Sequence, residues 1–431
     1  MKKYIAAMDI GTSGCKAIII DEAGTVVASA TEEYPLYSPR PGWNEQDPDD
    51  WWRGAHTSLR AAIAKSGVSA GQIAVVSLSG QMHGLVAMDK NNSVIRRAFL
   101  WNDQRCAKQC ADTIDICGGV DGLLRYTNNN LLAGYQGGKI LWLRENEPEN
   151  YEKMVVALLP KDYVRFKLTG DYATEVSDAS GTGFFDVEKR DWAYGLLEKL
   201  RVPASLFPRC VESDVITGEV GAEAAELCGL KKGTPVAGGG GDSVIQTTGM
   251  GLIEEGILGL TLGTAGIVAM GFSQYMRNSG GKLQFFCNNT SGLYHVMGVM
   301  LAGGGSYQWY RNNLCRWEAE EAKREGVNTY HFKKDMSRAI MESVTYGMRQ
   351  ISMSIQDLKQ VGMSRIIVSG GGSYSDIWRQ IISDVFQLPV ITVSGAKEGG
   401  RLRGVPCGRR GVRHLGQPSR GMRHTLRGDA Q

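Results

Sequence analysis

Residues 234–248 read Thr-Pro-Val-Ala-Gly-Gly-Gly-Gly-Asp-Ser-Val-Ile-Gln-Thr-Thr, and the rest of the chain is organised around this stretch. Its apolar start, Pro235 to Ala237, predicts a strand, after which four glycines lead to Asp242. Because glycine has no side chain, this backbone can approach a ligand while the carboxylate is presented at its end. Asp242 is therefore a candidate general base for a substrate hydroxyl. A second interpretation stays open, in which Asp242 only caps the following helix.

Two further glycine clusters favour the first interpretation. Residues 260–266 read Leu-Thr-Leu-Gly-Thr-Ala-Gly, and residues 366–373 read Ile-Ile-Val-Ser-Gly-Gly-Gly-Ser. Glycines of this kind leave room for a polyphosphate to meet a second substrate. We therefore expect a site where both ligands are held close to Asp242.

The length and composition indicate a large globular protein. A chain of 431 residues is long enough for two substantial cores, so we expect two lobes with a cleft. The chain is 42% hydrophobic and 22% charged, and no apolar run reaches the roughly 18 residues that a membrane span needs. No signal peptide precedes the first predicted strand, which favours a cytoplasmic location. The nine cysteines lack a Cys-x-x-Cys pair or zinc-like spacing, so reduced and mostly buried thiols are expected.

The net charge of +3 is unevenly distributed along the chain. Residues 401–431 contain eight arginines and one acid and contribute +7, which leaves −4 for the first 400 residues. A mildly acidic body is typical of a metabolic enzyme that binds small molecules. We expect neither a nucleic acid nor a membrane as partner.

The N-terminus predicts a three-stranded antiparallel meander, with strands at Tyr4–Asp9, Cys15–Ile20 and Thr25–Ala30. Asp9 ends the first strand and is followed by the turn Gly11-Thr-Ser-Gly14. Backbone N–H and hydroxyl groups of such a turn can hold phosphate oxygens, and Asp9 can hold Mg²⁺ through water. An ordinary hairpin turn without a ligand would use the same residues.

Taken together, these segments resemble the FGGY family of carbohydrate kinases within the actin-like ATPase superfamily. There, a first phosphate loop, a second Gly-Thr turn and a late Gly-Gly-Gly segment bordering adenosine follow one another, as Asp9–Gly14, Leu262–Gly266 and Ser369–Ser373 do here. The resemblance implies an α/β, two-lobed actin-like ATPase (ribonuclease H-like) fold with a central cleft, ATP as a substrate, and Mg²⁺ held at Asp9. The residues expected to bind the nucleotide are Gly11, Thr12, Ser13, Lys16, Gly263, Thr264, Gly370, Gly371 and Gly372.

Two polar segments are candidates for sugar recognition. Residues 80–84 read Gly-Gln-Met-His-Gly, and residues 99–105 read Phe-Leu-Trp-Asn-Asp-Gln-Arg. A polyol requires hydrogen bonds of both senses and an apolar face for its C–H groups, although a solvated turn has a similar composition. Both segments are similar to the branch of the family that acts on D-xylulose, in which Met and His touch the ketose. The resemblance gives the expected substrate-binding residues as Gln81, Met82, His83, Trp101, Asn102, Asp103 and Asp242.

Several further elements follow from sequence patterns. Asp47 or Asp50 is expected to cap a helix that begins near Trp51. Two amphipathic helices separated by a short strand are expected between residues 138 and 170, and a long helix is expected over 334–361. Asp178 is a candidate for holding the substrate loop.

The expected lobes are residues 1–234, with the first phosphate loop and sugar site, and 235–400, with the base, the second phosphate loop and the adenosine loop. The resemblance fails near 314–334, where the family has a much longer stretch, and after residue 400, where the family has an Ala-rich helix. Residues 401–431 are rich in Arg and Gly without periodicity. Because the next reading frame can spell a helix of the expected kind, we interpret this tail as frameshifted and disordered, in preference to an RNA- or membrane-binding arm.

The resemblance thus implies ATP-dependent phosphorylation of a ketopentose, D-xylulose at its terminal hydroxyl, with Asp242 as base. The alternatives are a kinase for ribulose, fuculose, gluconate or glycerol, and a non-catalytic actin-like binding protein damaged by the two departures. Intact Asp9 and Asp242 favour catalysis. The oligomeric state stays open, with a homodimer as one option.

Overall fold

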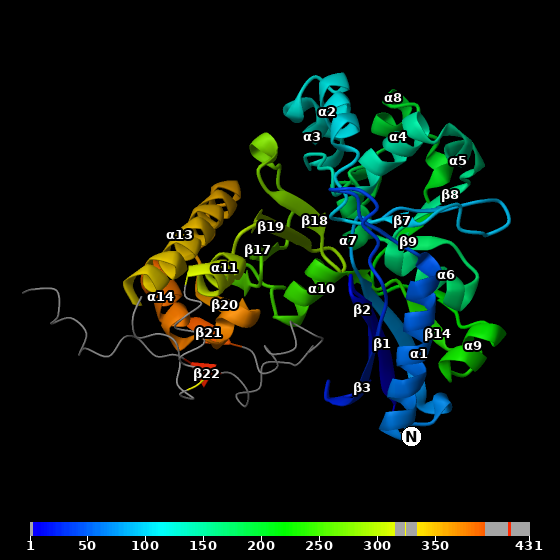
Figure 1. Ribbon diagram of the computed structural model, residues 1–431, viewed down its shortest axis with the longest axis horizontal. Helices are drawn as coiled ribbons and strands as arrows, with labels where there is room; N and C mark the ends of the chain where they lie inside the picture. Colours follow the sequence, from blue (N-terminus) through cyan, green and yellow to red (C-terminus); the bar gives the residue numbers. More distant parts are fainter. Residues whose placement is uncertain (1–2, 315–323, 325–333, 393–412, 415–431) are drawn as a thin grey trace, which may run out of the picture. The chain divides into compact units, whose positions relative to one another are not determined.

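The computed structural model describes residues 3–314, 324, 334–392 and 413–414 (Figure 1). By its internal contacts the chain divides into two compact units. The first consists mainly of Met1–Thr248 and Ser273–His295, and the second mainly of Gly249–Phe272 and Val296–Arg401. This division ends the first unit after Thr248, whereas the sequence led us to expect a boundary at 234. Asp242 therefore belongs to the first unit.

The first unit is built on a mixed sheet whose strand order is β13-β14-β5-β1-β2-β3, with β15 also paired to β5. The predicted meander is confirmed, because β1, β2 and β3 pair antiparallel in sequence order. Strand β5 runs parallel to β1, and β15 runs parallel to β5. The strands are β1 (Tyr4–Ile10), β2 (Gly14–Asp21), β3 (Val26–Glu33), β5 (Ile73–Gly80), β13 (Ile216–Glu219), β14 (Pro235–Ala237) and β15 (Gly240–Gly241).

The register of the parallel strands places the candidate carboxylates at one edge of this sheet. Asp9 of β1 lies opposite Ser79 of β5, and Ser79 lies opposite Gly240 of β15. Asp242 follows directly after β15 and begins α10 (Asp242–Gly249). Parallel strands have their C-terminal ends at the same end of a sheet. Asp9 and Asp242 therefore lie at the same end of this sheet, although they are far apart in sequence.

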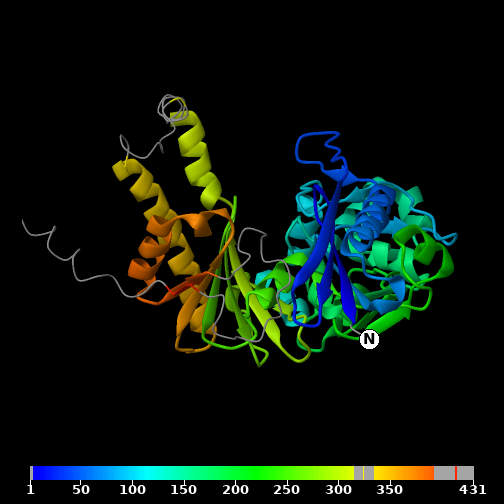
Figure 2. The ribbon, with the colours of Figure 1, turned by 90° about the horizontal axis from the view of Figure 1, so that it is seen from below.

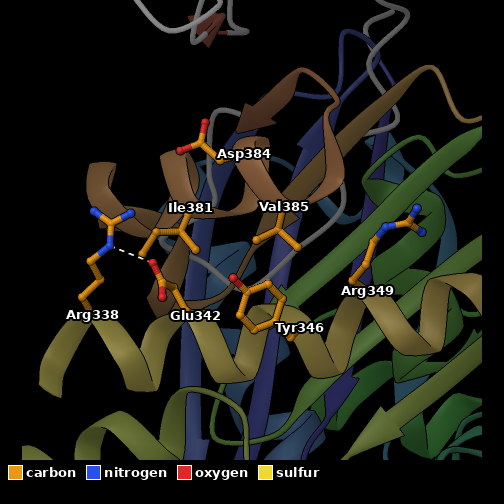
Figure 3. Close-up of a pocket in the computed structure, with 7 residues that line it drawn as sticks. All are labelled: Arg338, Glu342, Tyr346, Arg349, Ile381, Asp384 and Val385. Carbon is orange, nitrogen blue, oxygen red and sulfur yellow. Dashed lines mark hydrogen bonds and ion pairs between the residues drawn. The ribbon is translucent and has the colours of Figure 1, made fainter. Parts of the chain in front are cut away.

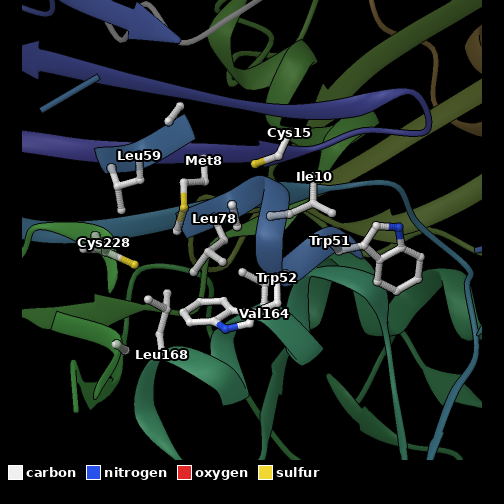
Figure 4. Close-up of a cluster of buried hydrophobic side chains, with 14 of the residues drawn as sticks. Met8, Ile10, Cys15, Trp51, Trp52, Leu59, Leu78, Val164, Leu168 and Cys228 are labelled. Carbon is white, nitrogen blue, oxygen red and sulfur yellow. The ribbon is translucent and has the colours of Figure 1, made fainter. Parts of the chain in front are cut away.

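Helix α1 (Pro48–Ser66) covers one face of the meander and packs against β2 and β3 (Figure 2). The helix begins three residues earlier than expected, with Asp47 as its N-cap, and Gly67 in a left-handed conformation ends it. Trp51 and Leu59 on its buried face belong to the main core of the unit. Figure 4 shows these side chains among residues from the sheet and from other helices. This core fixes the strands that carry the site.

The rest of the first unit consists of short helices and strand pairs around this core. The predicted arrangement of two helices separated by a short strand is confirmed by α4, β8 and α6. The helices are α2 (Ala107–Ile116), α3 (Val120–Thr127), α4 (Gln136–Asn146), α5 (Pro148–Lys153), α6 (Pro160–Thr169), α7 (Val176–Ala179), α8 (Tyr194–Lys199) and α9 (Ala222–Cys228). The remaining strands are β4 (Glu45–Gln46), β6 (Val86–Met88), β7 (Ala98–Phe99), β8 (Val156–Leu158), β9 (Ala173–Glu175), β10 (Phe185–Asp186), β11 (Asp191–Trp192), β12 (Arg209–Val211) and β18 (Gln284–Cys287).

A second sheet has the order β18-β19-β17-β16-β20-β21-β22, and its strands from β17 to β22 belong to the second unit. Helix α13 packs against α14 and against β17. The predicted long helix and the strand–turn–strand pattern around the second Gly-Thr turn are both confirmed. The elements are β16 (Ile257–Leu262), β17 (Gly266–Phe272), β19 (Tyr294–Met300), β20 (Arg365–Ser369), β21 (Val390–Thr392), β22 (Arg413–His414), α11 (Gly304–Leu314), α13 (Lys334–Leu358) and α14 (Asp376–Phe386).

Two expectations lie outside the described residues. These are the shortened segment near 314–334, apart from its ends and Arg324, and the tail 401–431, apart from β22, which pairs with β21. Within the described ranges, no helix is long and apolar enough to cross a membrane. The seven cysteines that the structure describes are unpaired, and five of them are buried, as expected.

Candidate active site

Asp242 stands at the junction of β15 and α10. It begins the helix, and its Oδ1 accepts a hydrogen bond from the Ser243 N–H at 2.7 Å. Burial raises the pKa of Asp242 to about 7, the negative charge of Asp9 adds to the effect, and the Ser243 hydrogen bond opposes it. A carboxylate with a pKa near the working pH is well suited to accept a proton in a transition state.

Asp9 is the second carboxylate at this edge. Its Oδ1 is buried and has no hydrogen-bond partner among the described residues. In the same part of the chain, no group of three or more His, Cys, Asp or Glu side chains could hold a metal by itself. A single unpaired carboxylate fits Mg²⁺, which keeps several waters and is held through one or two carboxylates together with substrate phosphates.

The turn after Asp9 is held in place by side chains from other elements. The Gly11 N–H donates to the Gly14 carbonyl at 3.1 Å, and the Tyr34 hydroxyl donates to the Gly11 carbonyl at 2.5 Å. Gln46 Nε2 donates to the Thr12 carbonyl at 2.7 Å. With these carbonyls engaged, the turn is preorganised as a phosphate loop would need to be.

The other residues expected near this loop occupy distinct places. Lys16 of β2 lies opposite Asp9 in the register of the hairpin. The Ser13 carbonyl accepts a hydrogen bond from the Tyr34 N–H at 3.3 Å, so its peptide helps to anchor the loop.

Gln81 was expected to contact the sugar, but its side chain is engaged with the phosphate loop. Its Oε1 accepts from the Thr12 hydroxyl at 3.2 Å, and its Nε2 donates to the Gly11 carbonyl at 3.3 Å and to Gln46 Oε1 at 2.9 Å. The side chain is buried. Gln46 is a supporting residue that sequence reasoning missed, although it lies next to the expected helix cap Asp47.

Met82 brings the predicted sugar segment beside the base. Its Sδ accepts a hydrogen bond from the Ser243 hydroxyl at 3.2 Å. A Cβ atom at Gly241 would lie only 2.7 Å from Met82 Sδ, so these two segments pack as closely as a glycine allows.

His83 has a defined tautomer in this structure. Its Nδ1 lies 2.6 Å from the Gly181 carbonyl, its ring stacks on Tyr135 with centroids 4.6 Å apart, and burial lowers its pKa to about 3. Because a carbonyl can only accept, Nδ1 carries the proton of the neutral ring. Nε2 is therefore a hydrogen-bond acceptor suited to a hydroxyl group.

A buried lysine supports the unusual backbone of His83, whose φ is 71°. Lys139 Nζ donates to the His83 carbonyl at 2.7 Å and also to the Gly134 carbonyl. Burial lowers the pKa of Lys139 to about 8. Sequence reasoning missed this lysine, because a lysine within an amphipathic helix gives no local sign of burial.

Trp101 and Asn102 keep groups free for a ligand. The Trp101 indole N–H donates to the Thr12 hydroxyl at 3.0 Å, yet the residue is 46% exposed, so its ring is available to C–H groups. Asn102 Oδ1 is buried and has no hydrogen-bond partner in the described chain. A buried unpaired amide oxygen is costly unless a ligand satisfies it.

Asp103 differs from its neighbours, because protein donors already saturate its carboxylate. Its Oδ1 accepts from the Arg105 backbone N–H at 3.0 Å and from Arg105 Nε at 2.9 Å, while Oδ2 accepts from the Asn44 N–H at 2.8 Å and from Arg105 Nη2 at 2.7 Å. The Arg105 guanidinium lies over the Trp43 and Phe99 rings at 3.8 and 4.3 Å. This arrangement leaves Asp103 no free acceptor for a sugar.

In the second unit, the predicted glycines form one packed arrangement. The Thr264 carbonyl accepts from the Gly303 and Gly305 N–H groups at 2.9 and 3.1 Å. Gly370 has a φ of 81°, and a Cβ there would lie 2.8 Å from the Leu262 carbonyl oxygen, next to Gly263. Gly371 and Gly372 follow in a short 3₁₀ turn. Sequence reasoning missed residues 303–305, although Leu301-Ala-Gly-Gly-Gly-Ser306 is a fourth glycine cluster.

A pocket of about 460 Å³ between α13 and α14 contains none of the predicted residues (Figure 3). An ion pair between Arg338 and Glu342, with Nε and Oε1 2.7 Å apart, lies on its wall. The seven residues that line it are Arg338, Glu342, Tyr346, Arg349, Ile381, Asp384 and Val385.

Comparison with known proteins places these observations in a family. Residues 4–249 match the N-terminal domain of the FGGY family of carbohydrate kinases, and residues 325–402 match its C-terminal domain. The chain belongs to the FGGY family of carbohydrate kinases. The expected activity class, an ATP-dependent sugar kinase, is thereby confirmed.

Among similar curated proteins of this family is a xylulose kinase of Bacillus subtilis, which is 33% identical over 426 residues that cover 90% of this chain and 84% of that protein. A xylulose kinase of Escherichia coli is 30% identical, with 88% of this chain and 84% of that protein covered. A solved structure of a xylulose kinase from Rhodospirillum rubrum superposes with a TM-score of 0.85 at 26% identity, covering 92% and 88% of the two chains. The expected α/β actin-like fold is thereby confirmed.

Proposed function

We propose that this kinase transfers the γ-phosphoryl group of ATP to the terminal hydroxyl of D-xylulose and releases ADP and D-xylulose 5-phosphate. The similarity to xylulose kinases over about nine-tenths of the chain supports the choice of sugar. The raised pKa of Asp242 is the observation that supports the chemical role. In the transfer, the sugar oxygen forms a bond to the γ-phosphorus, the bond from that phosphorus to the β,γ-bridging oxygen breaks, and Asp242 takes the hydroxyl proton.

The sugar would be held by groups that the protein leaves unpaired. Nε2 of His83 would accept from a sugar hydroxyl, Asn102 Oδ1 would accept from another, and the exposed face of Trp101 would cover C–H groups. Met82 would border the sugar beside Asp242. We assign supporting roles to Gln81 and Asp103, because their polar atoms are engaged within the protein.

The phosphates and the nucleoside would use the glycine-rich turns. In the first unit, Gly11, Thr12 and Ser13 would hold phosphate oxygens, with Lys16 adding positive charge. In the second unit, Gly263, Thr264 and Gly370 to Gly372 would hold the nucleotide. Asp9 would hold Mg²⁺, whose charge would offset the negative charge on the phosphates.

A coupled assay of ADP release with purified protein, ATP, Mg²⁺ and D-xylulose tests this proposal. We expect ADP release that depends on the sugar, together with D-xylulose 5-phosphate identified by ³¹P NMR. Ribulose, fuculose, gluconate and glycerol form the comparison panel. A higher kcat/KM for any of these would reassign the substrate, and no sugar-dependent ADP release with the whole panel would overturn the proposed activity.

A further inference from the structure

Behind the strand ends that carry the site lies a fully buried cluster of one lysine and three carboxylates. Lys161 Nζ lies 2.7 Å from Asp162 Oδ1, 3.2 Å from Asp178 Oδ2 and 3.4 Å from Glu175 Oε1. None of the four side chains is more than 1% exposed. Burying ions in this way is expensive unless the geometry is well satisfied, and none of them takes part in the chemistry described above.

One member of the cluster is tied to the strand that precedes the base. The Gly241 N–H donates to Ser177 Oγ at 3.1 Å, and Ser177 Oγ lies 3.0 Å from Glu175 Oε1. Gly241 is the residue before Asp242. A line of hydrogen bonds and ion pairs therefore runs from Lys161 through Glu175 and Ser177 to the backbone of the base.

The direction of each hydrogen bond along this line is fixed. Glu175 caps α7 and accepts from the Ser177 and Asp178 N–H groups and from the Ser213 hydroxyl. The Ser177 hydroxyl proton must then go to Glu175, since a carboxylate only accepts. The oxygen lone pairs of Ser177 are left for the Gly241 N–H.

Asp178 is a member of this cluster and has a shifted pKa. Burial raises the pKa of Asp178 well above its usual value, with Lys161 opposing the effect. Lys161 Nζ lies within 3.4 Å of a carboxylate oxygen of each of the three acids. Asp178, which the sequence suggested as a holder of the substrate loop, thus belongs to this supporting cluster.

The opposite side of Gly241 is also restrained. A Cβ there would lie within 2.8 Å of both Met82 Sδ and Met82 Cε, and the Met82 sulfur itself accepts from Ser243. On this side Gly241 has van der Waals contacts with Met82, and the hydrogen bond to Ser177 adds a side-chain restraint to the pairing of β15 with β5. Even a small displacement of a reacting group lowers a phosphoryl-transfer rate, because that rate depends on positioning.

We propose that Ser177 is a positioning residue for the base: its hydroxyl, oriented by Glu175 and Lys161, fixes the Gly241 peptide and hence the direction in which Asp242 points. The inference rests on the proposed role of Asp242. The Ser177 hydroxyl acts on the orientation of Asp242, so removal of this hydroxyl lowers kcat while binding of both substrates is retained.

Steady-state kinetics of Ser177→Ala, Ser177→Cys and Ser177→Thr test the proposal. We expect Ser177→Ala to lower kcat about tenfold, as for one lost hydrogen bond, with the KM values for D-xylulose and ATP within about twofold of wild type. Ser177→Cys keeps the volume of the side chain, but its thiol is a poor hydrogen-bond partner. We expect it to lower kcat as Ser177→Ala does, and it replaces Ser177→Ala in the test if that variant fails to fold. Ser177→Thr keeps the hydroxyl and is expected to recover most of kcat.

The control is Ser58→Ala, which removes a buried hydroxyl that donates to the Ala55 carbonyl within α1. It is expected to leave kcat unchanged. A wild-type kcat for Ser177→Cys, or a fall in kcat accompanied by equal rises in both KM values, would overturn the positioning role. Failure of the wild-type protein to turn over any sugar would instead overturn the proposed function, so the two failures are distinguishable.

Discussion

Two regions of the first unit contain buried aspartates whose hydrogen bonding differs: the strand ends with Asp9 and Asp242, and the loop with Asp103. At the C-terminal ends of the parallel strands, Asp9 Oδ1 has no hydrogen-bond partner among the residues that the structure describes, and burial raises the pKa of Asp242 to about 7. In the loop after β7, Asp103 accepts from donors at both oxygens, and Arg105 is fully buried between it and aromatic rings. Both regions contain acids that sequence patterns marked as functional.

The difference suggests a criterion, based on hydrogen bonding, that separates buried carboxylates that hold a loop from those that bind a ligand. A carboxylate whose lone pairs all accept hydrogen bonds from the protein holds a loop in place. A buried carboxylate with few protein donors has lost its hydration, so a ligand or metal ion that binds to it regains more of that free energy. This criterion favours Asp242 and Asp9 as the residues that would act on substrate and metal in the proposed function, and Asp103 as a support for Trp101 and Asn102.

The largest expected effect is on turnover. Asp242→Asn keeps the size of the side chain and removes the base, so kcat should fall about 10²-fold or more while the dissociation constant of D-xylulose changes little. The measurement is the ADP-release assay together with calorimetric titration of the sugar. The matched variant is Asp103→Asn, for which kcat should change far less. Equal losses of kcat in the two variants would remove the distinction between the regions.

The next effect is on stability and concerns the other region. Arg105→Ala leaves the Asp103 carboxylate buried without its partner, and we expect a loss of about 3–5 kcal/mol in the free energy of unfolding. Urea denaturation measures it, with Arg53→Ala at an exposed ion pair as the control. A loss under about 1 kcal/mol for Arg105→Ala would mean that this pair does not hold the loop.

A smaller effect is expected on sugar binding. His83→Ala removes the Nε2 acceptor and should raise the KM for D-xylulose by about tenfold, the free energy of one hydrogen bond, while the KM for ATP stays unchanged. His83→Asn controls for the backbone, because asparagine tolerates the positive φ of this position. A raised KM for ATP with an unchanged KM for the sugar would mean that His83 contacts the nucleotide, which would contradict its assignment to the sugar.

The elements were predictable because their signals are local. The meander, the long helix over Lys334–Leu358 and the strand–turn–strand around Thr264 follow from apolar period and glycine placement. The fate of each polar side chain was not predictable in this way. Asp103 accepts hydrogen bonds from Arg105 and from Asn44, the latter 59 residues away in sequence, and Gln81 bonds to Gln46.

The supporting residues share this difficulty. Lys139 and Ser177 are ordinary residues of helices by sequence, and only the tertiary contacts reveal that they hold His83 and Gly241. The glycines at 303–305 could have been found, since their cluster is as dense as the others. The return of residues 273–295 to the first unit has no local sign in the sequence.

The most direct test of the raised pKa of the buried Asp242 carboxyl is thermal melting of the metal-free wild type and Asp242→Asn between pH 4 and 8. The carboxyl has a pKa of 3.8 in the unfolded chain and about 7 in the folded protein, so the folded state binds more protons in this window and the wild type loses stability as pH rises through it. The loss is at most about 4 kcal/mol, and less where solvent reaches the carboxylate. The melting temperature of Asp242→Asn should therefore rise relative to wild type from pH 4 to about 7 and then level off. A variant that is less stable than wild type at pH 8, or a difference that does not change with pH, would contradict a buried Asp242 carboxyl with a raised pKa.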